Sequence, residues 1–196
     1  MISRDRPEPL VIRPPSEWRS LLVRVTRGCP WNRCRFCGIY PALWGTGHEA
    51  RSVEEVGRDI ALARERLRRA PPATAFLGDA DPLGIGTDDL VEILGRLRAT
   101  FPTIRRVTAY ARLSTLLRKG EEDLARLARA GLTRVHAGLE SGSDAVLRYQ
   151  RKGLTAKAAI EAGRRSARAG LEVSLYVLLG LGGRDREEEH VAGTAR

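Results

Sequence analysis

Short apolar runs alternate with amphipathic helical segments along most of this 196-residue chain. The runs predicted as strands are residues 21–25, 73–77, 104–110, 133–140 and 171–180. Helices are predicted at residues 52–69, 87–100, 121–130, 143–149 and 155–169, with a last helical stub at 187–195. Strict alternation of this kind calls for parallel strands joined by right-handed crossovers. We therefore expect an α/β fold with parallel strands, which is a partial (β/α) barrel of the TIM type or an open arc of one.

The three cysteines of the chain lie together directly after the first predicted strand, at Cys29, Cys34 and Cys37. An odd number of thiols cannot close entirely as disulfides, and polar residues such as Asn32 and Arg33 surround them. A CxxxxCxxC run on one loop can bring three thiolates close to one metal centre. This spacing predicts a metal site.

Two kinds of metal centre compete for these cysteines. Closed zinc sites are almost always four-coordinate, but the sequence has no second CxxC pair, and His48, His136 and His190 lack the local spacing that usually partners cysteines. A four-iron cluster accounts better for three ligands, because one iron then keeps an open position for an outside ligand. The zinc alternative corresponds to a basic binding module, possibly for nucleic acid, without catalysis.

The cysteine segment resembles the cluster loop of the radical S-adenosylmethionine (radical SAM) superfamily. In that loop the third cysteine follows an aromatic residue, as Cys37 follows Phe36. The commonest superfamily spacing is CxxxCxxC, and this chain has one extra residue between the first two cysteines, a longer spacing that recurs in a subset. The order of motifs over roughly residues 20–195 resembles the group that includes oxygen-independent coproporphyrinogen oxidase, Elongator-type and methylthiotransferase-like enzymes.

The resemblance implies an enzyme with two cofactors, a [4Fe-4S] cluster and S-adenosyl-L-methionine. Cys29, Cys34 and Cys37 would hold the cluster, which reductively cleaves S-adenosylmethionine to a 5′-deoxyadenosyl radical. That radical takes a hydrogen atom from a substrate that the sequence does not identify. An external electron donor of the flavodoxin or ferredoxin type is the expected partner.

Further unusual motifs follow the predicted strands, where β/α barrels build their sites. The resemblance implies cofactor contacts from Phe36, Gly78, Asp79, Ala80, Asp81, Ser114, Glu140, Ser141 and Lys152. Each has a simpler alternative: Asp79 and Asp81 suit a plain turn, Glu140 could cap the next helix, and Lys152 could be a surface lysine. We expect His136 to lie in barrel packing and His48 in a loop, without catalytic roles.

The formal net charge of +10 raises nucleic acid as a partner. The arginines are spread over helical segments and aromatic residues make up only 5% of the chain, so nucleic acid is possible but not favoured. No run of eighteen apolar residues and no signal-type stretch occurs, so we expect no membrane span and a cytoplasmic location.

Two segments of different character divide the chain. Residues 1–18 contain four prolines and are predicted to form an extended, irregular N-terminal arm, and residues 19–196 are predicted to form the radical SAM core domain. Cores of this superfamily normally have six β/α units, and we count five. We therefore expect a core that is truncated at its C-terminus or completed by a partner chain.

Overall fold

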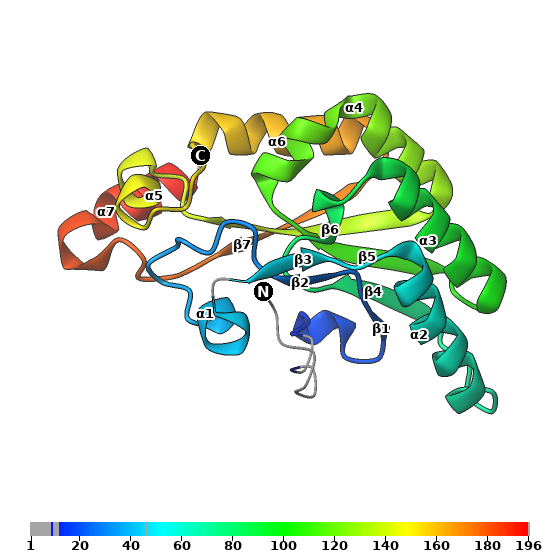
Figure 1. The fold of residues 1–196 in the computed structure, drawn as a ribbon. Coiled ribbons are helices and arrows are strands. Elements are labelled where there is room, and N and C mark those ends of the chain that lie inside the picture. The colour runs from blue at the N-terminus through cyan, green and yellow to red at the C-terminus, as the bar shows by residue number, and fades with distance from the viewer. Residues whose placement is uncertain (1–8, 10–11, 46, 196) are drawn as a thin grey trace.

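A five-stranded parallel sheet lies at the centre of the computed structural model, which describes residues 9, 12–45 and 47–195 (Figure 1). Its strands, in spatial order, are β1 (Leu21–Arg24), β4 (Thr74–Gly78), β5 (Arg106–Ala111), β6 (Leu132–Glu140) and β7 (Glu172–Val177). Every neighbouring pair is parallel. The prediction of a parallel α/β fold with five β/α units of a TIM-type barrel is confirmed.

Helices occupy two positions relative to the sheet. One face is covered by α2 (Val53–Arg66), α3 (Thr87–Thr100), α4 (Leu113–Ala130) and α6 (Ala156–Arg168) (Figure 1). The short helices α1 (Ile39–Trp44) and α5 (Asp144–Tyr149), with α7 (Gly183–Thr194), gather where the strands end (Figure 1). Two 3-10 turns, η1 (Pro15–Glu17) and η2 (Pro82–Gly84), precede β1 and α3 respectively.

The covering helices bury the apolar positions that their spacing predicts. In α3, residues Leu90, Ile93, Leu94 and Leu97 recur at helical spacing and are all buried. Each such side chain contributes roughly 1.5–3 kcal/mol of transfer free energy. In α2, Ser52 caps the first turn by accepting a hydrogen bond from the Glu55 amide at 3.2 Å, as the sequence predicts.

The two faces of the sheet differ in chemistry because successive strand residues point to opposite sides. Toward the helices lie small or branched apolar side chains, which are fully buried: Ala75, Leu77, Val107, Ala109, Val135 and Ala137. The opposite, inner face carries Arg24, Phe76, Thr108, Tyr110, His136 and Tyr176, which the strand register sets in rows. The inner face is therefore the side of the sheet that carries polar and ionisable side chains.

The structure differs from the sequence-based expectations in the N-terminal arm, at His48 and at the start of α4. Part of residues 1–18 packs against the core: Pro15–Glu17 forms a 3-10 turn and Glu17 is fully buried, so the expectation of an unpacked arm is wrong there. Residues 1–8, 10 and 11 lie outside the described part. His48 begins a strand instead of lying in a loop. Helix α4 begins at Leu113, earlier than predicted, and bends at Gly120, whose φ is +75°.

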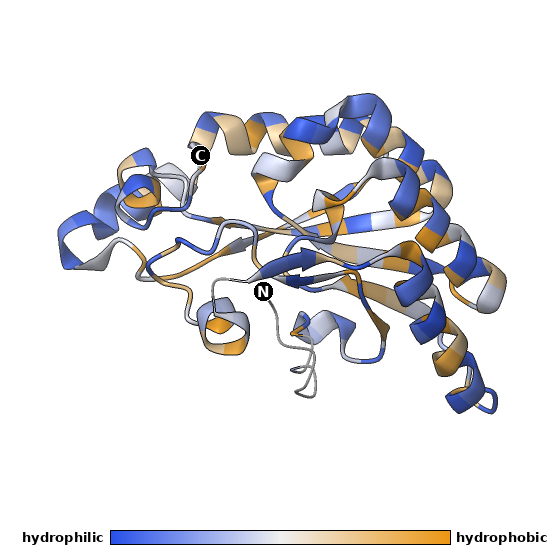
Figure 2. Ribbon diagram, viewed as in Figure 1, coloured by the Kyte–Doolittle hydropathy of each residue, from blue (hydrophilic) through white to orange (hydrophobic). Residues whose placement is uncertain are grey.

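A small antiparallel ribbon closes the base of the cysteine segment. It pairs β2 (Thr26–Gly28) with β3 (His48–Ala50), and both strands are hydrophilic in Figure 2. Beneath it, Arg51 donates to Glu55 at 3.0 Å, and Arg27 donates to the same carboxylate. The two guanidinium groups lower the pKa of Glu55 from 4.5 to about 2.

Replacing Glu55 with glutamine should destabilise the protein by about 1–3 kcal/mol at pH 7, because two buried arginines lose their shared carboxylate. The depressed pKa means that this stabilisation is present above pH 4.5 and is lost as the pH falls toward 2. Urea denaturation of wild type and Glu55→Gln at several pH values measures the difference. A difference that stays constant from pH 7 to pH 3 would contradict the assignment.

Candidate functional site

The loop between β2 and β3 carries the three cysteines. Cys29, Cys34 and Cys37 are each partly exposed and free. Burial raises the pKa of Cys34, and the charges of Cys29 and Cys37 raise it further, whereas Lys152 and Arg112 lower it. The three thiols are thus neighbours in space as well as in sequence.

Backbone groups of the same loop contact the cysteines. The Asn32 amide donates to the Cys29 sulfur at 3.4 Å, and the Cys37 amide donates to the Cys34 carbonyl at 3.2 Å. Within residues 12–45 and 47–195, no group of three or more His, Cys, Asp or Glu side chains is arranged to hold a single metal ion.

Distant segments fix the position of the cysteine loop. The indole nitrogen of Trp31 donates to the Arg151 carbonyl at 2.7 Å, and the Arg35 amide donates to the Gln150 carbonyl at 3.0 Å. These contacts tie the loop to the segment between α5 and α6, which follows the end of β6. At the base, Gly28 has φ +72°, and a β-carbon there would lie 1.9 Å from the Gly47 carbonyl oxygen.

Three of the predicted cofactor-binding residues come together beside the thiols. Lys152 Nζ lies 2.8 Å from Glu140 Oε1 and 5.6 Å from the centre of the Phe36 ring. Glu140 adopts a left-handed φ of +68° at an irregular register of β6 and β7. A β-carbon on Gly138 would lie 1.9 Å from Glu140 Oε1, so the glycine leaves the space that this carboxylate fills.

The two aspartates of the turn after β4, Asp79 and Asp81, lie in different environments. Asp79 is buried, its carboxylate lies 3.6 Å from Arg24 Nε, and Tyr40 of α1 hydrogen-bonds to it. Burial and this carboxylate together raise the pKa of Tyr40. Asp79 thus links the end of β4 to the helix that follows the cysteines. The Gly78 carbonyl accepts from Val25 at 2.6 Å.

Asp81 is used by the protein itself. Its two carboxylate oxygens accept from the Arg112 amide at 3.0 Å and from the Thr115 hydroxyl at 2.6 Å, which caps the start of α4. Burial raises its pKa, and these two hydrogen bonds oppose the rise. The simpler alternative, a turn and cap residue, describes Asp81 well. Ala80 lies half-buried between the two aspartates.

Ser141 is directed toward α7 and not toward the cysteines. Its hydroxyl lies 2.8 Å from His190 Nδ1 and accepts from the Ser143 amide at 3.0 Å, and both Ser141 and His190 are buried. Next to it, the Ser143 hydroxyl donates to Glu189 at 2.5 Å. These contacts fasten α7 across the end of β6.

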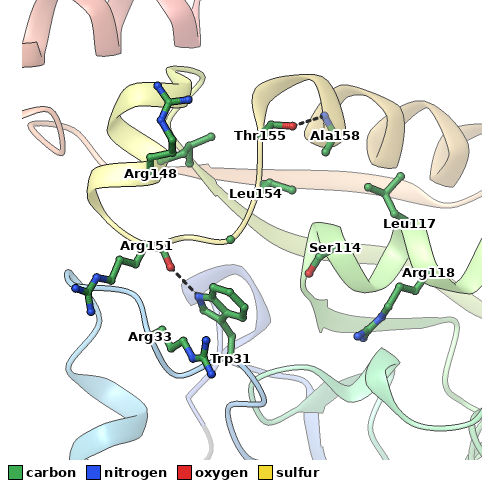
Figure 3. A pocket seen from close by; sticks show the side chains of 12 residues that line it. Trp31, Arg33, Ser114, Leu117, Arg118, Arg148, Arg151, Leu154, Thr155 and Ala158 are labelled. Carbon is green, nitrogen blue, oxygen red and sulfur yellow. Dashed lines mark hydrogen bonds between the residues drawn. The ribbon is translucent and has the colours of Figure 1, made fainter.

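Ser114 lines a pocket of about 890 Å³ between the cysteine loop, α4 and the segment that leads into α6 (Figure 3). Trp31 and Ser114 face the same space, with Arg33 and Arg118 beside it (Figure 3). The Ser114 hydroxyl is buried and has no hydrogen-bond partner among the described residues. Four lining residues are arginines and none is acidic: Arg33, Arg118, Arg148 and Arg151. The guanidinium groups of Arg148 and Arg151 point away from the space (Figure 3), and most of the lining is apolar.

Sequence reasoning missed Tyr110 and Tyr176 of the inner face, whereas it placed His136 in barrel packing, where it is buried against Phe76 and Tyr176. Tyr110, His136 and Tyr176 stand there on neighbouring strands, with Tyr110 directly opposite His136 in the register. Burial raises the pKa of Tyr110, and Tyr176 and Asp79 add to the rise. The signal was present, because each of these strands alternates small apolar residues with polar or aromatic ones.

The sequence of the chain matches the radical SAM superfamily over residues 23–195. The chain belongs to the radical SAM superfamily. Radical SAM proteins are enzymes that use a [4Fe-4S] cluster and S-adenosylmethionine. No curated protein matches the chain. No helix among the described residues is long and apolar enough to cross a membrane.

Solved radical SAM enzymes share the fold. The cobalamin-dependent S-adenosylmethionine radical enzyme OxsB aligns with a TM-score of 0.72 at 21% identity, over 92% of this chain and 27% of its own. Methylornithine synthase, PylB, aligns with 0.62 at 16%, over 89% and 48%. Coproporphyrinogen III oxidase, HemN, from Escherichia coli aligns with 0.53 at 17%, over 80% and 36%. The chain thus spans about a quarter of the OxsB chain.

Replacing Gly28 with alanine should cost about 1–3 kcal/mol, because the new methyl group meets backbone at a left-handed φ. Gly163 of α6 is the matched control: it has no atom within 4 Å of an added β-carbon. Gly163→Ala should stabilise the helix by about 0.4–1 kcal/mol. Urea denaturation compares the two variants with wild type. Equal stability of Gly28→Ala and wild type would show that the loop base adapts without strain.

Proposed function

We propose that this chain is the catalytic core of a radical SAM enzyme in which Cys29, Cys34 and Cys37 hold a [4Fe-4S] cluster. The observation that carries the proposal is the placing of three neighbouring thiols on the loop between β2 and β3 of a chain that belongs to the radical SAM superfamily. Closed zinc sites almost always have four protein ligands, whereas a four-iron cluster held by three thiolates keeps one iron open for an outside ligand. The donor set therefore fits the cluster better than zinc.

The protein groups around the thiols suit the needs of this cofactor. When bound, the cluster supplies the electron that cleaves S-adenosylmethionine reductively to a 5′-deoxyadenosyl radical. The Asn32 amide, which donates to the Cys29 sulfur at 3.4 Å, would stabilise negative charge on that ligand. The three cysteines are only partly exposed, and Trp31, held against the Arg151 carbonyl in the same loop, would limit the access of water.

Binding of S-adenosylmethionine is assigned to the group beside the thiols. We assign the methionyl ammonium or a ribose hydroxyl to Glu140 and the methionyl carboxylate to Lys152, with Phe36 beneath the lysine. Gly78, Asp79 and Ala80 remain proposed contacts through the turn after β4. The contacts of Asp81 and Ser141 support structural roles instead.

The substrate and the electron donor stay at the level of chemical class. The pocket beside Trp31 and Ser114 has a mostly apolar lining with Arg33 and Arg118 beside it (Figure 3), which supports a substrate that has an apolar part next to a negatively charged group. Arg33 and Arg35 are exposed on either side of Cys34, which would favour an acidic electron donor of the flavodoxin or ferredoxin type. We propose a cytoplasmic location, since a reducing compartment keeps such thiols reduced.

Anaerobic reconstitution with iron and sulfide tests the cluster. Wild-type protein should turn brown, absorb near ~400 nm and hold about four irons, and should release 5′-deoxyadenosine when dithionite and S-adenosylmethionine are added. Cys34→Ser should lose most of the iron. Arg35→Gln, in the same loop, should keep it. Colourless protein that retains stoichiometric zinc, or a Cys34→Ser variant with full iron content, would overturn the proposal.

Glu140→Gln tests the binding of S-adenosylmethionine. The variant loses the charge that faces Lys152, and we expect the Kd of the reconstituted protein to rise about tenfold, which is 1.4 kcal/mol. Glu161→Gln removes a carboxylate that pairs with Arg165 on α6, and its Kd should equal that of wild type. Isothermal titration calorimetry measures all three proteins. Equal affinity of Glu140→Gln and wild type would remove Glu140 from the site.

A further inference from the structure

Three ionisable side chains form a continuous row on the inner face of the sheet. The Tyr176 hydroxyl lies 2.9 Å from His136 Nδ1, and His136 Nε2 lies 3.4 Å from Glu17 Oε1. They come from β7, β6 and η1, so the chain brings them together only when it folds. The contact between Tyr176 and His136 is a hydrogen bond, whereas His136 Nε2 makes no hydrogen bond of good geometry, so Glu17 acts on the imidazole through its charge. A carboxylate, an imidazole and a hydroxyl in this order have the arrangement of a proton relay.

The surroundings decide which nitrogen of His136 carries the proton. Glu17 is fully buried and already accepts from Ser20 at 2.5 Å and from Arg106 at 3.3 Å, so it is held as an acceptor. A neutral imidazole beside this carboxylate places its proton on Nε2, because the opposite tautomer would direct a lone pair at negative charge. His136 Nδ1 is then the acceptor for the Tyr176 hydroxyl.

Burial and three charged neighbours shift the pKa of His136. Burial lowers the pKa of His136, Glu17 raises it, and Arg134 and Arg106 lower it. Phe76 lies beside the imidazole with ring centres 6.0 Å apart, and the Tyr176 ring stacks on it at 6.0 Å with a 15° angle. Burial also raises the pKa of Tyr176. The imidazole is thus neutral and able to accept a proton, and the negative charge of Glu17 has to offset the burial of both groups.

Tyr176 also lies near the residues that are proposed to bind S-adenosylmethionine. It is opposite Gly138 in the register, and Gly138 borders the Glu140 and Lys152 pair. Unlike His136 and Glu17, Tyr176 is only partly buried, so its oxygen can meet a ligand on the inner face.

We propose that Glu17, His136 and Tyr176 form a proton relay in which Tyr176 is a general base toward a ligand bound on the inner face. The Tyr176 oxygen takes a proton from a hydroxyl group of the ligand, and the phenolic proton passes to His136 Nδ1. Glu17 stabilises the imidazolium that forms. The reverse transfer returns the proton to the product, so no oxidant or reductant is needed. His136 and Glu17 are positioning residues in this scheme.

The ligand is identified with the substrate only through the proposed function, but the relay can be tested without the cluster. N-acetylimidazole is the probe. The Tyr176 oxygen forms a bond to the acetyl carbon, the bond from that carbon to imidazole breaks, and the phenolic proton leaves through His136 to the departing imidazole. Peptide mapping by mass spectrometry follows acetylation at all four tyrosines of the full chain.

Tyr149 is the internal control because it is 50% exposed and has no histidine partner among the described residues. An unassisted phenol reacts as phenolate, so its rate rises about tenfold for each pH unit below pH 10. We expect Tyr176 to react at least about tenfold faster than Tyr149 at pH 7.5. Its rate should change less than about twofold between pH 7 and pH 8.5.

Variants separate the relay from simple exposure. His136→Gln should reduce acetylation of Tyr176 to the rate of Tyr149 or below and restore the steep pH profile, and Glu17→Gln should give an intermediate loss. If His136→Gln does not fold, the wild-type pH profile alone decides. Tyr176 reacting no faster than Tyr149, or with the same steep profile, would overturn the relay while leaving the iron content, and hence the proposed function, untouched.

Discussion

The pairing of β2 with β3 is the constraint on which the rest of the site depends. It joins the two ends of the cysteine loop, which runs from Cys29 to Gly47. Closing a loop of this length costs about 2–3 kcal/mol of chain entropy, before any metal is bound. Ladder hydrogen bonds, the ion pairs of Arg27 and Arg51 with Glu55, and the close approach at Gly28 offset that cost. The three thiols are therefore positioned by the fold and not only by a ligand.

The two faces of the sheet have different roles. One packs against the helices and stabilises the fold, and the other carries the polar side chains. Residues such as Val107, Ala109 and Val135 pack under the helices and supply the hydrophobic free energy. Alternate residues of the same strands point the other way, where Tyr110 and His136 meet. A substitution on one face consequently has little direct effect on the other. This division lets the inner face carry polar groups without loss of the core.

The spacing of apolar residues along the sequence predicted most of the fold but only part of the site. Helix α3 was predicted over residues 87–100 and is observed as Thr87–Thr100, because its apolar spacing is regular and long. The three-residue strands β2 and β3 carry no such period, and no expectation included them. The roles of Asp81 depend on partners that lie 31 and 34 residues away in the sequence, and Glu17 pairs with Arg106, which lies 89 residues away. Contacts of this range become visible only in three dimensions.

Burying Glu17, His136 and Tyr176 on the inner face lowers the stability of the fold. This loss of stability helps to decide why the three residues are there. Removing a carboxylate and an imidazole from water carries a penalty that hydrogen bonds and ion pairs repay only partly. Apolar residues of similar volume would fill the same space at lower cost, as they do on the opposite face. Glu17 is nevertheless fully buried, with Ser20 and Arg106 arranged around it. Because packing alone does not require these groups, a chemical role is the better physical account of why the fold gathers them there.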